Sequence, residues 1–306
     1  MEEKIIRDQT FDEERALYHL CGAHVVNCVF AGPADGESVL KEARDVTVEN
    51  CRFSLRYPLW HTERFRLVRA EMDGLTRAPI WYASEGVIDS SHIEGIKCLR
   101  ECEDITVKKS RIASPEFGWR CRRLTISDCD IESQYFLFEC RDVKVSGLTM
   151  RGKYSFQYIE NMEIENSFLD TKDAFWHTKN VTVKNSVLKG EYLGWYSENL
   201  TLIDCKIIGT QPLCYCKGLK LMNCTTEDAD LAFEYSEVDA DIRGGILSIK
   251  NPASGRITAD SVGEIVTEDS VIATSCEIIL RGKDESAGDQ PRVIYLGKAE
   301  EKNDAV

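Results

Sequence analysis

A fixed period of 19 residues governs most of this chain, and residue types return in the same columns each time the period recurs. The aligned segments begin at Asp45, Arg64, Glu85, Asp104, Arg123, Asp142, Asn161, Asn180, Asn199, Gly218 and Glu237. From Asp104 onward every spacing is 19 residues. A fixed period of this length is typical of one structural unit stacked on copies of itself. The sequence therefore predicts a solenoid before it indicates any function.

Each segment has the pattern of a short strand followed by a corner. In the segment that begins at Asn180, the apolar residues Val181 and Val183 alternate with polar ones, which predicts a strand with one buried face. The sixth place is Asn or Asp in most segments, here Asn185, and these residue types tolerate the left-handed conformation of a sharp corner. A small residue, here Ser186, follows the corner.

We predict an all-β fold: a single-stranded right-handed parallel β-helix of about 11–12 coils of roughly 19 residues. A segment of this length is too short for a strand, a crossover helix and a second strand. Extended chain advances roughly 3.3 Å per residue, so one coil has a circuit of about 60 Å, enough for three short sides. Right-handedness follows from the usual hand of parallel crossovers.

The β-helix is expected to occupy residues 1–282, including an amino-terminal cap in which residues 4–16 cross the first coil. Residues 283–306 are expected to form a polar loop, one last strand at residues 293–296 and a tail at residues 299–306. The sequence leaves open whether that strand seals the end of the solenoid or pairs with a neighbour. Association of identical chains is open for the same reason.

Composition narrows the classes of partner. A net charge of −14 argues against nucleic acid and anionic membranes, because both require a basic surface. The chain has no apolar run long enough to cross a membrane and begins without the apolar core of a signal peptide, so we expect a cytoplasmic protein. Cysteines fall in columns shared with Ser, Thr and Ala, which favours thiols as small packing residues over metal ligands. We expect no metal and no cofactor.

The third side of the coil carries two unusual columns. The tryptophan column holds Trp60, Trp81, Arg100, Trp119, Phe138, Gln157, Trp176, Trp195, Cys214 and Phe233. The next column, the outward ladder, holds His61, Tyr82, Glu101, Arg120, Glu139, Tyr158, His177, Tyr196, Tyr215 and Glu234. Adjacent residues of a strand face opposite ways. We expect the tryptophans to point inward with the neighbouring thiols, and the ladder to face solvent.

These columns supply the candidate ligand-binding residues. They are Trp119, Arg120, Glu101, Glu139, His177 and Tyr196, together with Lys172, Asp173 and Glu191, which come just before the third side and would form the rim of a groove. Aromatic rings suit planar or sugar-like ligands. Ordinary surface charge and pairing of charges along the stack are the plainer interpretations of the charged members. No catalytic residue is assigned.

Several strings resemble an uncharacterised bacterial family, the domain of unknown function DUF3737. They are Phe11–Tyr18, Tyr57–Trp60, Arg77–Tyr82, Lys172–Trp176, Gly190–Trp195 and Leu231–Ser236. The resemblance implies a pectate-lyase-like right-handed β-helix and brings no established activity. Related members carry Gly-Glu-Arg and Trp-Asn where this chain has Glu13-Glu14-Arg15 and Trp176-His177.

Two classes of function remain. The first is a module that binds a carbohydrate-like small molecule or a protein partner on its aromatic and charged face. The second is a lyase or glycoside hydrolase acting on polysaccharides or oligosaccharides, as the fold resemblance implies. Hydrolysis would need two carboxyls roughly 5 to 10 Å apart, and Glu101 and Glu139 lie two coils apart in one column. The absence of a signal sequence favours the binding module.

Overall fold

The computed structural model describes residues 4–32, 37–281 and 291–297. The chain divides into two compact units, Met1–Phe175 and Trp176–Val306, which are described separately below. Within the described residues every regular element is a β-strand. The same residues include no helix that is long and apolar enough to span a membrane.

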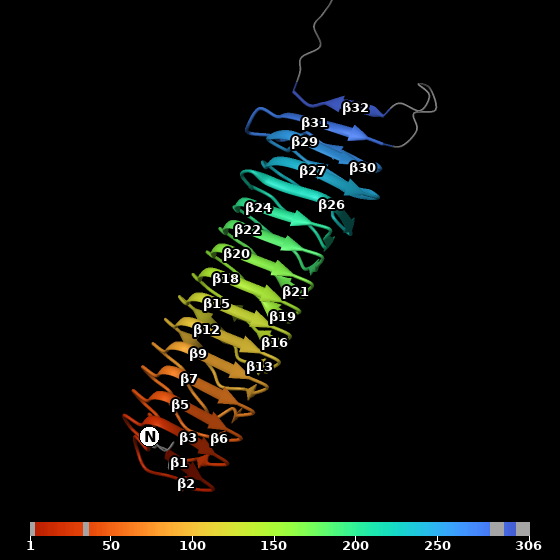
Figure 1. Ribbon diagram of the computed structural model, residues 1–306. Coiled ribbons are helices and arrows are strands. Elements are labelled where there is room, and N and C mark those ends of the chain that lie inside the picture. Colours follow the sequence, from red (N-terminus) through yellow and green to blue (C-terminus); the bar gives the residue numbers. More distant parts are fainter. Residues whose placement is uncertain (1–3, 33–36, 282–290, 298–306) are drawn as a thin grey trace, which may run out of the picture. The chain divides into compact units, whose positions relative to one another are not determined.

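In the first unit, one strand from each coil forms the first side, and each pairs in parallel with the strand of the next coil (Figure 1). These strands are β1 (Lys4–Arg7), β3 (Cys21–Val26), β5 (Arg44–Glu49), β7 (Glu63–Val68), β9 (Ser84–Asp89), β12 (Glu103–Lys108), β15 (Arg122–Ser127), β18 (Arg141–Ser146) and β20 (Glu160–Glu165). Their burial alternates, with apolar side chains facing the interior.

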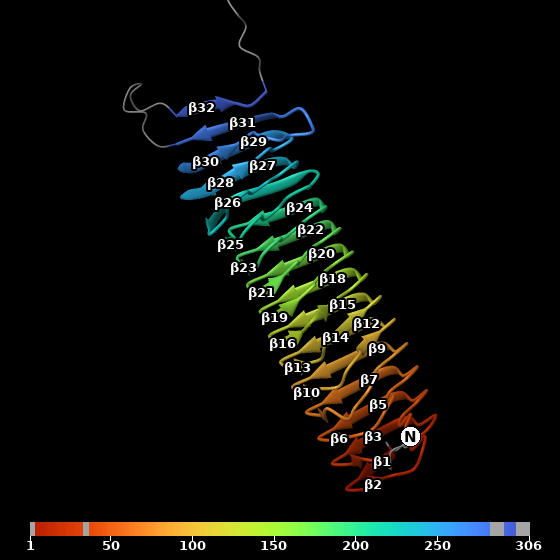
Figure 2. The same ribbon diagram turned by 180° about the vertical axis from the view of Figure 1, so that it is seen from behind.

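The second side follows directly after each corner. Figure 2 shows the ribbon from behind, where several of its strands are labelled. It holds β2 (Thr10–Phe11), β4 (Val29–Phe30), β6 (Arg52–Phe53), β8 (Glu71–Met72), β10 (His92–Ile93), β13 (Arg111–Ala113), β16 (Asp130–Ser133), β19 (Thr149–Lys153) and β21 (Phe168–Lys172). In the described part of this unit the third side has regular strands in three coils, β11 (Cys98–Arg100), β14 (Glu116–Trp119) and β17 (Tyr135–Phe136), which form a separate sheet.

The second unit is built in the same way. Its first side holds β22 (Lys179–Lys184), β24 (Glu198–Ile203), β26 (Leu219–Glu227), β27 (Glu237–Arg243), β29 (Ser254–Ala259) and β31 (Ser275–Leu280). Its other strands are β23 (Val187–Lys189), β25 (Lys206–Ile208), β28 (Gly245–Lys250), β30 (Ser261–Val266) and β32 (Arg292–Tyr295). All its pairs are parallel except that of β32 with β31.

The register confirms the predicted stacking. Ile126 pairs with Val145, and Val145 pairs with Ile164, so residues 19 apart are neighbours in successive coils. The interior is filled by ladders of like side chains, such as Phe30 and Phe53, whose ring centroids are 4.9 Å apart and whose side chains are fully buried. Burying one such side chain contributes about 1.5–3 kcal/mol. The fold is the predicted right-handed parallel β-solenoid.

The two units together hold about 14 turns of roughly 19 residues, more than the repeating columns suggest. At the amino end, β1 pairs in parallel with β3 and continues the first side, so the expectation that residues 4–16 cross the first coil is wrong. Near the carboxyl end the period changes, because Glu237 pairs with Ser254 and Ser254 pairs with Ser275. Those coils keep the architecture after the 19-residue spacing has ended.

At the carboxyl end, β32 overlaps the last strand expected at residues 293–296 and pairs antiparallel with β31. Residues 283–290 of the expected loop and the tail at residues 299–306 lie outside the described residues. The division of the chain at residue 282 therefore stays a prediction.

Candidate functional site

The third side is a succession of turns with left-handed residues, and this explains where its side chains point. Tyr57, Leu59 and His61 have φ angles of 60°, 60° and 54°. The N–H of Tyr57 donates to the carbonyl of Arg77 in one neighbouring coil, and the N–H of Leu59 donates to Val39 in the other. Leu59 is buried, whereas Trp60 is half-buried and His61 is exposed. Strict alternation, which we expected here, does not hold. The tryptophans and the exposed ladder residues both lie at the surface, whereas Cys214 and Phe233 of the tryptophan column are buried.

The tryptophan column satisfies backbone carbonyls. The indole N–H groups donate to the next coil from Trp60 to Ala78 (2.7 Å), Trp81 to Lys97 (2.7 Å), Trp119 to Tyr135 (3.4 Å), Trp176 to Tyr192 (2.7 Å) and Trp195 to Gln211 (2.8 Å). The amide of Gln157 does the same for the carbonyl of Asp173 at 3.1 Å. The prediction that the tryptophans point inward is wrong. They lie half-buried at the surface, held by the backbone.

Ring faces in this column are covered by neighbouring side chains. The rings of Trp60 and Trp81 stack with centroids 5.0 Å apart and planes 7° from parallel. The guanidinium of Arg100 lies 4.7 Å from the ring centroid of Trp81 and 4.8 Å from that of Trp119, which is cation–π geometry on both sides. Because these faces are occupied, the column offers a ligand mainly ring edges. Trp119 is therefore a support for the surface more than a stacking platform.

The outward ladder faces solvent, as predicted. In the first unit all its members are exposed: His61, Tyr82, Glu101, Arg120, Glu139 and Tyr158. The rings of His61 and Tyr82 stack at 4.9 Å with planes 14° apart. Stacking holds these two exposed rings face to face. The ladder thus presents polar groups in a fixed, repeating row.

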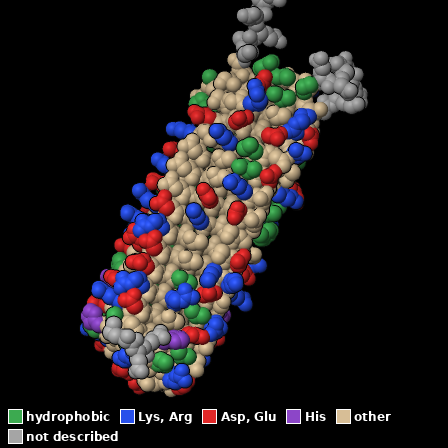
Figure 3. All heavy atoms as spheres, in the orientation of Figure 1, with side chains coloured by type: hydrophobic (Ala, Val, Ile, Leu, Met, Phe, Trp, Pro, Cys, Tyr) green, Lys and Arg blue, Asp and Glu red, His purple; other side chains and the backbone are tan. Residues whose placement is uncertain are grey.

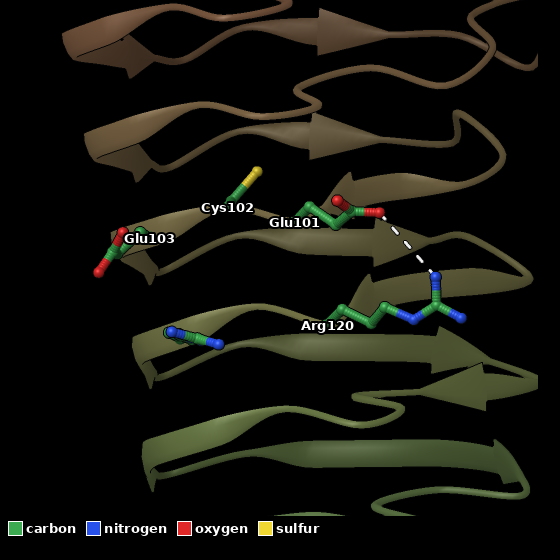
Figure 4. A pocket seen from close by; sticks show the side chains of 5 residues that line it. Glu101, Cys102, Glu103 and Arg120 are labelled. Carbon is green, nitrogen blue, oxygen red and sulfur yellow. Dashed lines mark ion pairs between the residues drawn. The ribbon is translucent and has the colours of Figure 1, made fainter.

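A charged trio occupies the middle of this ladder. The Nε of Arg120 donates to Glu139 at 2.8 Å, and an Nη of Arg120 lies 3.9 Å from a carboxylate oxygen of Glu101. Figure 4 shows Glu101 and Arg120 reaching toward one another from successive coils. The hydrogen bond to Glu139 raises the pKa of Arg120, which keeps it a cation. An open pocket of about 420 Å³ lies beside the trio, lined by Glu101, Cys102, Glu103, Arg120 and Arg122.

The trio suits hydrogen bonding better than acid–base catalysis. The side chains of Glu101, Arg120 and Glu139 are 43%, 55% and 42% exposed. A general acid in a glycosidase is usually a desolvated carboxyl with no cation beside it. Here both carboxylates flank one guanidinium in open solvent. The arrangement can accept and donate hydrogen bonds to a polar ligand without moving a proton.

The predicted rim residues of the first unit are only partly accessible. Lys172 is half-buried on β21 and pairs in register with Lys153 on β19. Asp173 is only 6% exposed, so it does not border an open surface, and its backbone carbonyl receives the amide of Gln157. The structure brings Glu101, Arg120 and Glu139 together, and it places Asp173 among buried residues.

The remaining candidates belong to the second unit. The rings of His177 and Tyr196 stack at 5.0 Å with planes 7° apart, and Tyr196 stacks on Tyr215 at 4.8 Å. His177 and Tyr196 are exposed, and Tyr215 is half-buried. Glu191 is exposed just before the third side. Three successive coils of this unit therefore carry an aromatic ladder of their own.

Sequence reasoning placed Glu234 in the wrong column. The N–H of Tyr215 donates to the carbonyl of Glu234, as Tyr196 does to Cys214, so Glu234 lies in the tryptophan column and Tyr235 takes its place in the ladder. Glu234 is 9% exposed, lies 2.8 Å from the ammonium of Lys250 and accepts the Tyr215 hydroxyl at 3.2 Å. Burial and this carboxylate raise the pKa of Tyr215 to about 12. The 20-residue spacing from Tyr215 to Tyr235 was the available signal.

The cysteines are packing residues. All thirteen are free thiols in the described residues, and all except Cys21 are buried. Cys205 and Cys216, for example, donate to backbone carbonyls of the preceding coil at 3.4 Å and 3.1 Å. Within the described ranges no three His, Cys, Asp or Glu residues gather as a metal site.

Sequence comparison decides the family. The pattern of the family described as "Protein of unknown function (DUF3737)" matches residues 4–279. The chain belongs to the DUF3737 family. No curated protein matches this DUF3737 chain.

The solved structures similar to the DUF3737 chain have low sequence identity to it and TM-scores below 0.5. The catalytic domain of a GH87 α-1,3-glucanase in complex with nigerose is 9% identical with a TM-score of 0.44, and the match covers 78% of this chain and 63% of that one. PfbA, a surface adhesin of Streptococcus pneumoniae, is 8% identical with a TM-score of 0.45, covering 96% and 90%. A tailspike protein of E. coli bacteriophage HK620 in complex with a hexasaccharide is 8% identical with a TM-score of 0.37, covering 90% and 74%.

Proposed function

We propose that this DUF3737 protein is a non-catalytic binding module that takes a carbohydrate-like ligand along its outward ladder. The observation that carries the proposal is the exposed run from His61 to Tyr158, one residue from each of six successive coils. Phenol, imidazole, carboxylate and guanidinium groups provide both donors and acceptors, which is what a polyhydroxylated chain requires. The ligand would lie along the ladder, with its repeating units meeting successive coils.

Rigidity supports binding by this surface. Stacked rings such as His61 and Tyr82 have little rotamer freedom left to lose, and the trio around Arg120 is held by its own ion pairs. Preorganised side chains raise affinity by lowering the entropic cost of association. Because ring faces are covered by neighbouring side chains, we expect hydrogen bonds to edges and charges to dominate over stacking on sugar rings. This revises the stacking groove expected from the sequence.

The lyase or hydrolase class has weaker support. Glu101 and Glu139 are exposed and share Arg120, so the two carboxylates that hydrolysis requires are engaged with a cation. A protein partner would meet the same exposed groups and is an outcome of the test. The cytoplasmic location stays a prediction.

The test is a glycan array followed by calorimetry on any hit. Arg120→Asn and Tyr158→Asn remove ladder groups, and Asn tolerates the left-handed φ of 54° and 57° at these positions. Both variants should weaken binding about tenfold or more, since each removes hydrogen bonds to the ligand. Arg66→Asn, at an exposed arginine of β7 on the first side, is the matched control and should bind normally.

No hit with the intact protein, or an equal loss in the Arg66 variant, would contradict the proposal. Incubation of the bound oligosaccharide with and without calcium, followed by assays for new reducing ends and for the absorbance of unsaturated products, separates binding from catalysis. Product formation would show that the module is an enzyme. If the intact protein captured a protein partner and the Arg120→Asn variant did not, the ligand would be a protein, and the outward ladder would remain the binding site.

A further inference from the structure

The backbone pattern of the outward ladder continues toward the amino end of the first unit. From His61 to Glu139, the N–H of each member donates to the carbonyl of the residue that precedes the next member. Glu42 donates in the same way to Trp60, and His19 donates to the residue before Glu42. The φ angles of His19 and Glu42 are 53° and 58°, so both have the left-handed conformation of the ladder. These two residues therefore occupy ladder positions in the two preceding coils.

Both residues present polar groups to solvent, and neighbouring side chains hold them in place. The side chains of His19 and Glu42 are 60% and 34% exposed, and the imidazole Nε2 lies 3.3 Å from a carboxylate oxygen of Glu42. The ring of Tyr18 lies against the imidazole, with centroids 4.0 Å apart. Desolvation and the carboxylate of Glu42 raise the pKa of the Tyr18 phenol. These contacts preorganise the amino-terminal end of the ladder, as the ion pairs of Arg120 preorganise its middle.

With these two members, the ladder of the first unit supplies one residue from each of eight successive coils. This eight-coil row consists of His19, Glu42, His61, Tyr82, Glu101, Arg120, Glu139 and Tyr158. Neighbouring strands are about 4.8 Å apart, so the seven steps of the row cover about 34 Å. Because the row is one residue wide, a ligand that contacts all of it must be a linear chain of that length.

The charges of the eight-coil row favour a neutral ligand. The row holds three carboxylates and one guanidinium, which sum to −2 with its two histidines neutral. The whole chain carries a charge of −14, so its field disfavours the approach of a polyanion. Figure 3 shows acidic and basic side chains interspersed on the face of the first unit that is in view. Carboxylates accept hydrogen bonds from hydroxyl groups, which a neutral sugar supplies along its whole length.

We propose that the ligand is a neutral, linear oligosaccharide of about eight sugar units that lies along the eight-coil row. This inference rests on the proposed function and names the class of ligand for the same site. Glu42 and His19 bind the sugar units at one end of the chain through a carboxylate and an imidazole. Arg120 and its two glutamates bind units near the middle. Each further unit adds hydrogen bonds to side chains that are already ordered, so affinity rises with chain length.

The test measures by calorimetry how tightly the intact chain binds linear xylo-, malto- and laminari-oligosaccharides of four and of eight sugar units. Oligogalacturonates of eight units are the acidic counterpart. For the sugar that binds best, the eight-unit chain should bind at least about tenfold more tightly than the four-unit chain, since it contacts twice as many coils. The oligogalacturonate should bind at least about tenfold more weakly than that eight-unit chain.

Glu42→Asn and His19→Asn test the amino-terminal end of the row, because Asn tolerates the left-handed φ angles at these positions. Each should weaken binding of the eight-unit chain about tenfold and leave the four-unit chain within about twofold, since a short chain can occupy the remaining coils. Glu71→Asn, at an exposed glutamate of β8 on the second side, is the matched control and should bind both chains normally. Thermal unfolding checks that each variant is folded.

The Arg120→Asn variant separates failure of this inference from failure of the proposed function. If Arg120→Asn weakened binding of the eight-unit chain while Glu42→Asn and His19→Asn did not, the binding site would end at His61 and the proposed function would stand without this inference. Equal affinity for the two lengths, or tighter binding of the oligogalacturonate, would also overturn it. If no oligosaccharide of this panel or of the array bound, both proposals would be wrong.

Discussion

At the residue scale, single side chains on the third side complete the backbone hydrogen bonding of the next coil. Trp81 and Gln157 differ in size and shape, yet each donates an N–H to a carbonyl of the following coil. Asn251 does the same for the carbonyl of Glu268 at 3.0 Å. What these positions share is a donor, because a part-buried carbonyl without a partner costs free energy. The tryptophans therefore stabilise the fold through the hydrogen bonds of their indole N–H groups as well as through the packing of their rings.

A matched pair of substitutions separates the donor from the ring. Trp81 and Trp119 lie at similar distances from Arg100, 4.7 Å and 4.8 Å, but their N–H bonds are 2.7 Å and 3.4 Å long. Trp81→Phe should therefore lower the free energy of unfolding by about 1 kcal/mol more than Trp119→Phe. Urea unfolding of both variants measures the difference. Equal losses would mean that ring packing, and not the donor, dominates.

The sequence could predict the ladder but not this role of tryptophan. Periodicity identifies which residues share a column, and it correctly placed Glu101, Arg120 and Glu139 on one exposed surface. It does not report φ. Leu59 and Phe156 have φ angles of 60° and 62°, values that such residues rarely adopt without the hydrogen bonds of neighbouring coils. Those hydrogen bonds form between neighbouring coils, so they cannot be predicted from the sequence of one segment.

At the element scale, the corner between the first and second sides is the feature that the sequence specifies best. Asn185 was expected to be left-handed, and the corner residues Asn27 and Asn185 have φ angles of 53° and 47°. Their amides also form ladders between coils, as Asn27 does by donating to Asp8 at 3.1 Å. Arg69 and Lys109 occupy the same corner position in other coils, with φ angles of 49° and 50°. Arg and Lys adopt the left-handed conformation less readily than Asn. These corners keep strain that Asn would relieve.

Replacing a strained corner should stabilise the protein. Lys109→Asn puts a residue that tolerates the left-handed region where φ is already 50°, and should raise the free energy of unfolding by about 0.5–1 kcal/mol. Lys144→Asn, the same exchange at an exposed position within β18, should lower it slightly because Asn is disfavoured in strands. The comparison is made by urea unfolding. If Lys109→Asn were no more stable than Lys144→Asn, the corner would not be strained.

At the scale of the whole molecule, stacking repeats each buried position from coil to coil. The cysteines show the effect most clearly. Twelve of the thirteen cysteines are buried. Burial raises the pKa of Cys51 and of Cys276 to about 12 and that of Cys216 to about 11, from an ordinary value of 9.0. Burial therefore keeps the thiols of Cys51, Cys216 and Cys276 neutral at pH values where the unfolded chain would ionise.

Alkaline pH should therefore destabilise the folded chain. Below pH 9 a thiol is protonated in both states; above it the unfolded thiol ionises first, so stability falls until the folded pKa is reached. With one pKa unit worth about 1.36 kcal/mol, a thiol that titrates at about 12 when folded withdraws about 2 kcal/mol by pH 10.5. Urea unfolding under reducing conditions at pH 8 and at pH 10.5 measures the loss.

A pair of alanine variants assigns that loss to burial. Cys276→Ala removes one buried thiol, so its deficit relative to the wild type at pH 8 should shrink by about 2 kcal/mol at pH 10.5. Cys21→Ala removes the exposed thiol and should leave the pH dependence unchanged, because it takes no thiol from the buried interior. If both variants kept the wild-type slope, the alkaline loss would come from other groups. A flatter slope in Cys276→Ala alone would show that the dry interior of the solenoid sets the upper pH limit of its stability.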